Sequence, residues 1–340
     1  MKKKVALLMP YHFSLYESIV KNLEANDYIV ELLVLSDKKF QYKNFNEKLT
    51  NFIQKFFLNN KNFKSQLRIN RHSEELVEKL KNIKFDFEYT LVIRPDYFSQ
   101  ESLELLKQKT KVFTAYQWDG FKRYPKILDY IKLFDRFFVF EKEDYDNYQG
   151  DYHNLHYTTN FYIDNFENIV EKEREEIFFL GSYLENRIDE IISITSFFEQ
   201  QNINTNIQIV YKKSNIPEKI KRSKIKVLES SVKYSEMINE IQRSKYLLEF
   251  QNTNIHNGLS FRVFESICFK KKLITNNPAI ANYDFYHPNN ILIWKNQNYE
   301  EIHNFLKLEY TDIDPDIYKK YSFSNWINYI FDNKPYIKID

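Results

Sequence analysis

The feature that most constrains the fold is a regular alternation of short apolar runs with segments of helical pattern. The apolar runs have the length of buried strands, and turn-forming residues bound them. Because strands that alternate with helices pair in parallel, with helices on both faces, the pattern predicts an α/β fold. Strands are expected at Lys4–Met9, Tyr28–Leu35, Thr90–Arg94, Lys111–Tyr116, Arg136–Phe140, Ile177–Leu180, Ile207–Tyr211, Ile225–Leu228, Lys245–Phe250, Lys272–Thr275 and Asn290–Trp294.

The chain length and one charged stretch predict two domains. A chain of 340 residues suits two domains of ordinary size better than one. The run Asp164–Glu175 is charged and has no core-like pattern, so we expect a linker there between domains at 1–165 and 176–340. Helices are expected near Ser14–Asn26, Asn44–Leu58, Glu74–Asn82, Gln100–Lys107, Pro125–Leu133, Glu185–Phe198, Ser235–Arg243, Tyr299–Leu306 and Ser324–Phe331, and from Gly258 onward.

Composition excludes several classes of function. The formal net charge of +2 argues against a nucleic-acid protein, although the many Tyr and Phe residues would suit stacking on single strands. The single cysteine, Cys268, excludes an internal disulfide and is expected to be a core thiol. No apolar run approaches the roughly 18 residues that a membrane span needs. We expect a cytoplasmic protein, at most peripheral at the inner face of the cell membrane.

The four glycines narrow the choice further. They stand at Gly120, Gly150, Gly181 and Gly258, and these positions allow neither a G-x-G-x-x-G fingerprint nor a P-loop. Gly181 and Gly258 fall at predicted strand-to-helix junctions. Nicotinamide oxidoreductases and P-loop kinases are therefore poor candidates.

One stretch, Lys245–Asn277, has the pattern of a complete β-loop-α-β unit. In such a unit the loop lies at the carboxyl edge of a parallel sheet, where open α/β folds bind ligands. Arg262 and Glu265 are three residues apart on the expected helix, so they project from nearly the same side. An arginine suits phosphate oxygens, a carboxylate suits the hydroxyls of a ribose, and amides at a helix start suit an anion. An ordinary surface ion pair is the alternative interpretation.

The segment GLSFRVFESICFKKKLITNN resembles the nucleotide-sugar-binding segment of bacterial GT-B glycosyltransferases, especially the CgeB-like and lipopolysaccharide or capsule biosynthesis type. These proteins carry a similar G-[LIV]-x-x-R-x-x-E helix followed by a K-x-[LIV]-I-[TS] strand. The resemblance extends weakly to Phe178–Ile192, which is similar to the first strand and glycine loop of their C-terminal domain. One departure is Phe269–Lys272, where many relatives have a glycine.

The resemblance implies the GT-B architecture, with two Rossmann-like parallel-sheet domains that face each other across a cleft. The C-terminal domain would hold the donor, and the last helix would be able to pack back on the N-terminal domain. Gly181 and Ser182 would approach the donor phosphates, or form a plain tight turn. Arg187 would be a second phosphate ligand, or an exposed helix cation. The donor-binding residues implied are Gly181, Ser182, Arg187, Asn257, Gly258, Leu259, Arg262 and Glu265.

The N-terminal half offers candidates for acceptor binding and for the general base of an inverting transfer. Asp119 is the first choice, because Gln-Trp-Asp-Gly places it on an exposed turn beside Trp118, whose indole would stack on a sugar. The alternative is an Asp-Gly turn without a catalytic role. His12 is the second candidate base, or a loop histidine bonded to backbone. Asp96 is a candidate acceptor ligand, or the cap of the helix that follows.

No metal and no cofactor is predicted. Asp312-Ile313-Asp314 matches the D-x-D pattern of metal-dependent glycosyltransferases, but Asp314-Pro315 favours a turn that starts a helix. We therefore predict a transferase that moves a sugar from a nucleotide-activated donor to a glycan or lipid-linked acceptor in bacterial surface polysaccharide or lipopolysaccharide synthesis. A non-catalytic nucleotide- or carbohydrate-binding protein of the same fold and a CMP-acidic-sugar transferase stay open as alternatives. The sequence does not decide whether the transfer inverts or retains the configuration of the sugar, nor does it give the oligomeric state.

Overall fold

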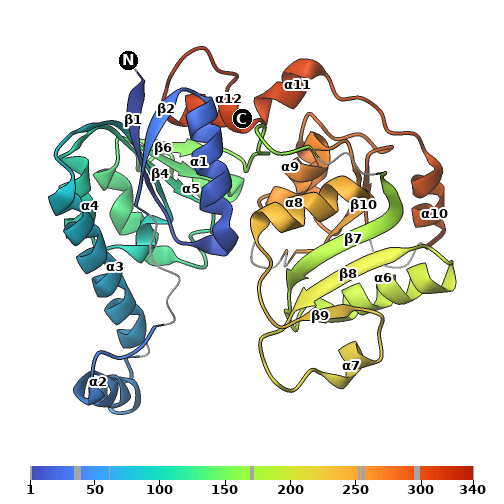
Figure 1. The fold of residues 1–340 in the computed structure, drawn as a ribbon, viewed down its shortest axis with the longest axis horizontal. Helices are drawn as coiled ribbons and strands as arrows, with labels where there is room; N and C mark the ends of the chain where they lie inside the picture. Colours follow the sequence, from blue (N-terminus) through green and yellow to red (C-terminus); the bar gives the residue numbers. More distant parts are fainter. Residues whose placement is uncertain are drawn as a thin grey trace. The chain divides into compact units, whose positions relative to one another are not determined.

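The computed structural model describes residues 2–33, 40–60, 62–168, 172–251, 253, 257–294 and 299–339. These residues form two compact units (Figure 1). The first unit comprises residues 1–12, 23–139 and 143–156, and the second comprises 13–22, 140–142 and 157–340. No helix among the described residues is long and apolar enough to cross a membrane.

The first unit is built on a parallel sheet that has six strands in the described part of the chain, in the order β2-β1-β3-β4-β5-β6. Its strands are β1 (Lys3–Leu8), β2 (Tyr28–Leu32), β3 (Phe87–Ile93), β4 (Thr110–Gln117), β5 (Arg136–Val139) and β6 (Leu155–Tyr157). Its helical segments are η1 (His12–Ser14), α1 (Leu15–Ala25), α2 (Phe45–Phe56), α3 (Phe63–Asn82), η2 (Pro95–Tyr97), α4 (Gln100–Lys107), η3 (Pro125–Leu133) and α5 (Lys142–Tyr148). Of these, parts of η1 and α1 and the first residue of α5 lie in the second unit. Strand order changes direction between β1 and β3.

The second unit also has a parallel sheet of six described strands, in the order β12-β11-β10-β7-β8-β9. Its strands are β7 (Arg174–Ser182), β8 (Thr205–Val210), β9 (Lys226–Leu228), β10 (Ser244–Glu249), β11 (Lys272–Thr275) and β12 (Ile291–Ile293). Its helical segments are α6 (Ile188–Gln200), α7 (Glu218–Lys221), α8 (Tyr234–Arg243), α9 (Phe261–Cys268), η4 (Pro278–Asn282), α10 (Tyr299–Lys307), α11 (Pro315–Lys320) and α12 (Phe323–Ile330). Here the strand order changes direction between β7 and β10.

Each sheet is buried by helices on its faces, as the alternation predicts. The strands carry the central apolar residues of each core, for example Leu91 and Phe113 in the first unit and Phe178 and Leu248 in the second. In the second unit α8 and α9 cover one face of the sheet and α6 the other (Figure 1). Ligands bind in open α/β sheets at the carboxyl ends of the two strands where the order reverses. The ends of β1 and β3, and of β7 and β10, are therefore the places to look for a site.

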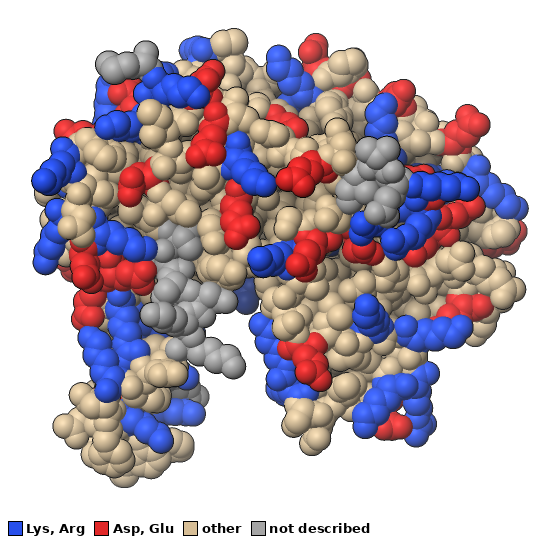
Figure 2. All heavy atoms as spheres, viewed as in Figure 1, with Lys and Arg blue, Asp and Glu red and all other residues tan. Residues whose placement is uncertain are grey.

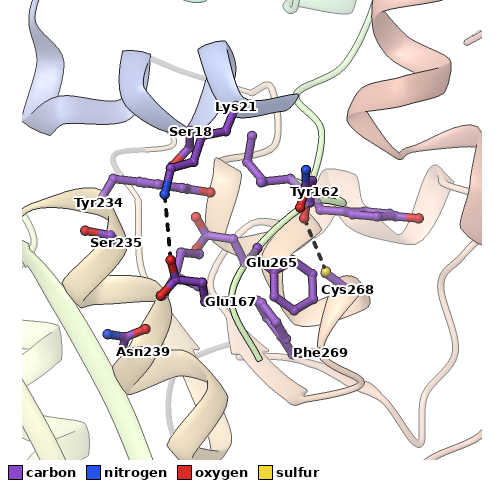
Figure 3. A pocket seen from close by; sticks show the side chains of 14 residues that line it. Ser18, Lys21, Tyr162, Glu167, Tyr234, Ser235, Asn239, Glu265, Cys268 and Phe269 are labelled. Carbon is purple, nitrogen blue, oxygen red and sulfur yellow. Dashed lines mark hydrogen bonds and ion pairs between the residues drawn. The ribbon is translucent and has the colours of Figure 1, made fainter. Parts of the chain in front are cut away.

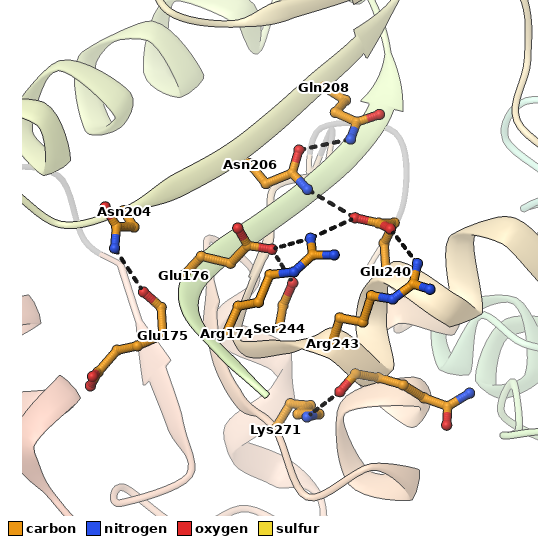
Figure 4. A network of polar contacts seen from close by, with 11 residues as sticks. Arg174, Glu175, Glu176, Asn204, Asn206, Gln208, Glu240, Arg243, Ser244 and Lys271 are labelled. Atoms are coloured by element: carbon orange, nitrogen blue, oxygen red, sulfur yellow. Dashed lines mark hydrogen bonds and ion pairs between the residues drawn. The ribbon is translucent and has the colours of Figure 1, made fainter. Parts of the chain in front are cut away.

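The charged stretch expected to be a linker is a strand at its C-terminal end. β7 begins at Arg174 rather than at Ile177, because polar partners satisfy its charged side chains (Figure 4). Arg174 lies 3.4 Å from Glu176 and 3.5 Å from Glu240, and the Ser244 hydroxyl donates to Glu176 over 3.1 Å. Apolar patterning does not detect a strand end of this kind, since its side chains make polar contacts instead of entering the core.

Two further expectations about local structure are wrong. The helix expected from Gly258 begins at Phe261, with Ser260 in the extended conformation of an N-cap residue. Asp96 does not cap α4, because Ser99 is the N-cap and its side chain accepts from the amide of Ser102. The loop expected at Gln251–Asn257 lies largely outside the described residues, as does the end of the strand expected at Tyr28–Leu35.

Candidate functional site

Gly181, Ser182 and Arg187 come together where the strand order of the second sheet reverses. Arg187 precedes α6 as its N-cap residue and is half-buried, so it is not an exposed helix cation. Its guanidinium donates to the carbonyl of Phe250 over 2.8 Å, beyond the end of β10, and to the carbonyl of Ser182 over 2.5 Å, at the end of β7. Among the described residues its buried Nε atom has no hydrogen-bond partner. Arg187 thus bridges the two strand ends and keeps one donor unused.

Gly181 is required by this arrangement. A Cβ atom at position 181 would lie 2.8 Å from Nη2 of Arg187 and 2.8 Å from the ring of Phe179. Such contacts are shorter than side chains adopt, so any other residue would displace the guanidinium or the ring. The absence of a side chain at Gly181 therefore leaves room for the guanidinium of Arg187 at the end of β7.

Glu249 connects this region to the helix that follows β10. Its side chain is buried, and the Thr275 hydroxyl donates to it over 2.5 Å. Burial raises the pKa of Glu249, while Thr275, Arg187 and Arg262 oppose the shift. Because both guanidinium groups act on this one carboxylate, the predicted phosphate ligands Arg187 and Arg262 lie in the same electrostatic environment.

Arg262 and Glu265 form the ion pair that their spacing predicts, but the pair is buried rather than on the surface. Nε of Arg262 lies 3.0 Å from Oε2 of Glu265, and the side chains are 9% and 2% exposed. Nη2 of Arg262 contacts the sulfur of Met237 at 3.1 Å. Burial raises the pKa of Glu265, and Arg262 and Tyr234 oppose the shift. Because burying an ion pair costs desolvation energy, the interior position of this pair does not fit the alternative interpretation as an ordinary surface ion pair.

Glu265 lines a cavity of about 270 Å³ within the second unit (Figure 3). Tyr234 enters the cavity from α8 and Glu265 from α9, beside an exposed ion pair between Lys21 and Glu167 at 3.8 Å. The buried atoms Oε1 of Glu265 and Oη of Tyr234 have no hydrogen-bond partner among the described residues. The Tyr234 hydroxyl is near enough to lower the pKa of Glu265 without forming a hydrogen bond of normal geometry. The carboxylate of Glu265 and the hydroxyl of Tyr234 therefore present two neighbouring oxygens to the cavity.

The backbone around Gly258 already binds a carboxylate. The amides of Asn257 and Gly258 donate to one oxygen of Glu141 over 3.0 and 2.7 Å. A Cβ atom at position 258 would lie 2.5 Å from the ring of Phe140. The carbonyl of Leu259 accepts from Asn160 over 2.8 Å. These amides form an anion site, which the carboxylate of Glu141 occupies in the structure. The absence of a side chain at Gly258 leaves room for the ring of Phe140.

In the first unit, three strand ends bring the N-terminal candidates together. Arg94 follows β3 and forms a two-pronged ion pair with Asp96, with both contacts at 2.7 Å. It also pairs with Asp119, beyond the end of β4. Asp119 has a second cation in Arg123 at 3.1 Å. The carboxylate chosen first as general base is therefore held between two guanidinium groups.

His12 and Trp118 are in direct contact. Their ring centroids lie 4.9 Å apart, and the strands that precede them, β1 and β4, flank β3. His12 and the next two residues all have positive φ angles, 28°, 56° and 61°, and Arg94 has a φ of 62°. Such backbone conformations cost of order 1–3 kcal/mol each and concentrate at functional sites. His12 is solvent-accessible as a residue, yet desolvation of its ring, together with Arg94, lowers its pKa to about 4.

The D-x-D match has local structural roles. Asp314 is the N-cap of α11 and accepts from the amides of Asp316 and Ile317. Asp312 pairs with Lys270 at 2.6 Å on the surface. No group of three or more His, Cys, Asp or Glu suited to a metal ion occurs among the described residues.

Sequence reasoning missed three residues of these clusters. Arg94 stands directly after β3, and Glu141 follows β5 with one residue between, so both carry the signal that singled out His12, Asp96 and Asp119. Tyr234 begins a helix and gives no signal in the sequence, because nothing local shows that its hydroxyl ends beside Glu265.

No protein-family model matches this chain, and no curated protein sequence matches it. Solved structures match over nearly its full length. An α-glucosyltransferase in complex with UDP-glucose and DNA containing an abasic site has a TM-score of 0.56 and 11% identity, covering 97% of this chain and 95% of its own. The apo structure of OtsA has a TM-score of 0.56 and 8% identity, with 99% and 100% covered. A protein described as a UDP-N-acetylglucosamine 2-epimerase from Listeria monocytogenes has a TM-score of 0.51 and 10% identity, with both chains fully covered.

These likenesses and the two parallel sheets together show the GT-B fold of two Rossmann-like domains, as the sequence predicted. At identities this low they establish the fold alone. What the chain does has to be argued from its own residues.

Proposed function

We propose that this chain is a glycosyltransferase that uses a nucleotide-activated sugar as donor. The acceptor would be a glycan or a lipid-linked glycan, in the assembly of bacterial surface polysaccharide or lipopolysaccharide. The motif around Arg262 and Glu265 supports a nucleotide-sugar donor. The similar structure of an α-glucosyltransferase in complex with UDP-glucose supports it further. The part in surface polysaccharide synthesis rests on the sequence resemblance only.

The observation that carries the proposal is the unsatisfied oxygen of Glu265 in its cavity. A carboxylate oxygen that is buried without a partner costs on the order of 1–3 kcal/mol or more, and a ligand hydroxyl would remove that cost. A ribose supplies vicinal hydroxyl groups, and Tyr234 offers a second hydrogen-bonding oxygen in the same cavity. In this proposal Glu265 and Tyr234 hold the ribose, and Arg262 fixes the carboxylate.

Arg187 and the end of β7 would hold the donor phosphates. The unused Nε donor of Arg187 would bind an anion. The amides of Asn257 and Gly258 are a second anion site, which becomes available to a phosphate once the carboxylate of Glu141 leaves it. Leu259 would contribute only its backbone.

In the transfer step the oxygen of the acceptor hydroxyl attacks C1 of the sugar as the bond from C1 to the phosphate oxygen breaks. The nucleotide leaves with the bonding electron pair, and arginine side chains stabilise its charge. In an inverting reaction a general base takes the acceptor proton. We favour His12 over Asp119, because its imidazole is neutral at pH 7 and Asp119 is paired with Arg94 and Arg123. Trp118 and Asp96 would contact the acceptor, and the stereochemistry stays open.

The test is a thermal-shift panel of UDP, GDP, ADP, TDP and CMP on the wild type, Glu265→Gln and Tyr234→Phe. A nucleotide at a hundred times its dissociation constant should stabilise the protein by about 2.7 kcal/mol. We expect one nucleotide to do so, and both substitutions to reduce its effect. Tyr234→Phe is the cleaner variant, since it removes the hydroxyl, keeps the buried ring and leaves the carboxylate of Glu265 in place. Glu236→Gln, at an exposed position of the same helix α8, is the matched control.

The outcomes separate the proposal from its alternatives. The nucleotide that binds names the donor, and CMP would indicate an acidic sugar. Release of that nucleotide from its sugar donor by the wild type supports a transferase. Tight binding without turnover, in the presence of candidate acceptors, would favour the non-catalytic binding protein. A folded protein that no nucleotide stabilises would remove the basis of the donor site.

A further inference from the structure

Helix α2 exposes an apolar face that nothing in the described structure covers. Fourteen large apolar side chains are exposed among the described residues, and seven of them lie between Phe45 and Leu58. Their exposed fractions range from 41% to 74%. On the helix, Phe45, Leu49, Phe52, Ile53 and Phe56 fall on one stripe of about 100°. Exposed apolar residues scattered singly are ordinary, but a contiguous set marks an interaction surface.

Helix α2 turns its polar side toward the rest of the protein and its apolar side toward solvent. Its three half-buried residues are Glu47, Asn51 and Gln54, and it has no fully buried residue. Glu47 pairs with Arg71 of α3 at 2.6 Å, and Asn51 donates to the hydroxyl of Tyr42 over 2.9 Å. An amphipathic helix normally buries its apolar stripe against the core. Polar contacts that hold α2 by the opposite side therefore present the stripe outward.

The charges beside the stripe are positive. Lys48 and Lys55 are exposed, seven residues apart, and lie along one flank of the stripe. The acidic residue of α2, Glu47, is the one that turns inward to Arg71. In the face shown in Figure 2, the lobe that carries α2 shows Lys and Arg side chains among residues that carry no formal charge. The outward side of α2 thus combines phenylalanine rings with ammonium groups.

We infer that α2 docks this protein on an anionic lipid surface, with the phenylalanine rings among the acyl chains and the lysines at the headgroups. Lysines on a polar flank and Phe and Leu on the other side are the composition of helices that lie in a membrane interface. A helix of twelve residues is too short to span a bilayer, so it lies along the surface. This inference rests on α2 alone and is independent of the proposed donor site.

The same observations argue against a protein as the occupant. A twelve-residue helix offers a stripe only roughly 18 Å long, so a protein partner would need further contacts beside α2 to reach the roughly 800 Å² that each partner contributes to a stable interface. Two copies meeting through this face would bring Lys48 and Lys55 against the same lysines. A lipid surface has no minimum footprint of this kind and supplies the opposite charge.

Vesicle co-sedimentation tests the inference with the full chain. We expect the wild type to sediment with vesicles made of equal parts phosphatidylcholine and phosphatidylglycerol, and much less with phosphatidylcholine alone. Phe52→Ser with Phe56→Ser should reduce binding at least about tenfold, because exposed apolar area drives insertion. Lys48→Glu with Lys55→Glu should reduce binding to anionic vesicles by a similar factor or more and remove its salt dependence.

One control is a substitution at another exposed apolar position, and a second is a measurement of the oligomeric state. Leu308→Ser removes an apolar side chain that is 45% exposed elsewhere, and should leave vesicle binding unchanged. All the substituted positions are exposed, so thermal unfolding of the variants should match the wild type. Failure to bind either kind of vesicle would overturn the inference, as would binding that survives the loss of Phe52 and Phe56. Self-association of the wild type that Phe52→Ser with Phe56→Ser abolishes would assign the face to a second copy instead.

Discussion

At the scale of single residues, Gly181 has a function that its position in the sequence only hints at. It leaves room for the guanidinium that ties the ends of β7 and β10 together. We predict that Gly181→Ala lowers the free energy of unfolding by about 1–3 kcal/mol, because Arg187 loses charged hydrogen bonds to two carbonyls. Gly150→Ala is the matched control, since no atom lies within 4 Å of the Cβ position there. Urea denaturation followed by circular dichroism measures both, and equal effects of the two substitutions would contradict this role.

His12 provides a second prediction, on protonation. Its pKa in the folded protein is lowered to about 4, below the roughly 6.5 of an unfolded chain. Between these values the unfolded state binds the proton more readily, so the contribution of His12 to stability is present above about pH 6.5 and is lost as the pH falls toward 4. We predict that the Cε1 proton resonance of His12 does not shift between about pH 8 and 5.5. The resonance is assigned as the one that is missing from the spectrum of the His12→Gln variant. A titration of this resonance near pH 6.5 would contradict the lowered pKa.

The candidate site was predictable residue by residue where a polar group follows a strand. His12, Asp96 and Asp119 were chosen in this way, because parallel strands end at a common edge. Their partners were not, since Arg94 reaches Asp119 and Glu141 reaches Gly258 through folds of the chain that no local pattern records. The strained backbone at residues 12–14 was also invisible, because those positions carry no glycine.

At the scale of elements, the end of α9 shows a backbone conformation maintained without its usual residue. The helix ends at Cys268 with Phe269 as its C-cap residue, and Lys270 then has a φ of 50°. It lies within the stretch Phe269–Lys272, where many of the proteins that the segment resembles carry a glycine. A left-handed conformation costs about 1–2 kcal/mol for residues other than glycine. The surface pair of Lys270 with Asp312 offsets little of this.

We therefore predict that Lys270→Gly raises the free energy of unfolding by about 0.5–1 kcal/mol, after the larger entropy that glycine has in the unfolded chain is subtracted. Lys270→Ala is the control, because it removes the same ion pair and keeps the strained conformation. The stabilities of the two variants and the wild type are compared by the midpoints of their urea denaturation curves. A glycine variant less stable than the alanine variant would show that the conformation is not strained.

The elements themselves were predictable to the extent that their side chains face a core. The buried strand β11 and the helix α4 have the predicted bounds. The short segments β6, α5 and α7 were missed, because three to seven residues leave no periodicity to detect. The helix start expected at Asp314-Pro315 is confirmed, since α11 begins at Pro315. η3 was expected as a helix and has the tighter 3₁₀ form. α2 was found by its pattern, but the pattern does not tell which side faces the protein.

At the scale of the whole molecule, the compact units are not continuous in sequence. Residues 13–22 and 140–142 belong to the second unit with 157–340, although the chain order places them among elements of the first. Asn22 is fully buried, donates to the carbonyl of Asn165 over 3.0 Å and accepts from its amide over 2.8 Å. Glu141 accepts from two amides beside Gly258. A composition shift predicts where a chain changes character, but it cannot assign short distant segments to a unit.

This division predicts that a fragment of residues 157–340 is much less stable than the same residues in the intact chain. The fragment lacks the partners of Asn165, Asn257 and Gly258 and the ring that packs on Gly258, so it loses these hydrogen bonds and this apolar contact. In the intact chain, Asn22→Ala and Glu141→Ala should each lower the free energy of unfolding by about 1–3 kcal/mol. Glu24→Ala, at an exposed position of α1, should change it by less than about 0.5 kcal/mol. If the fragment unfolds cooperatively at the urea concentration that unfolds those residues in the intact protein, the short segments are not part of the unit.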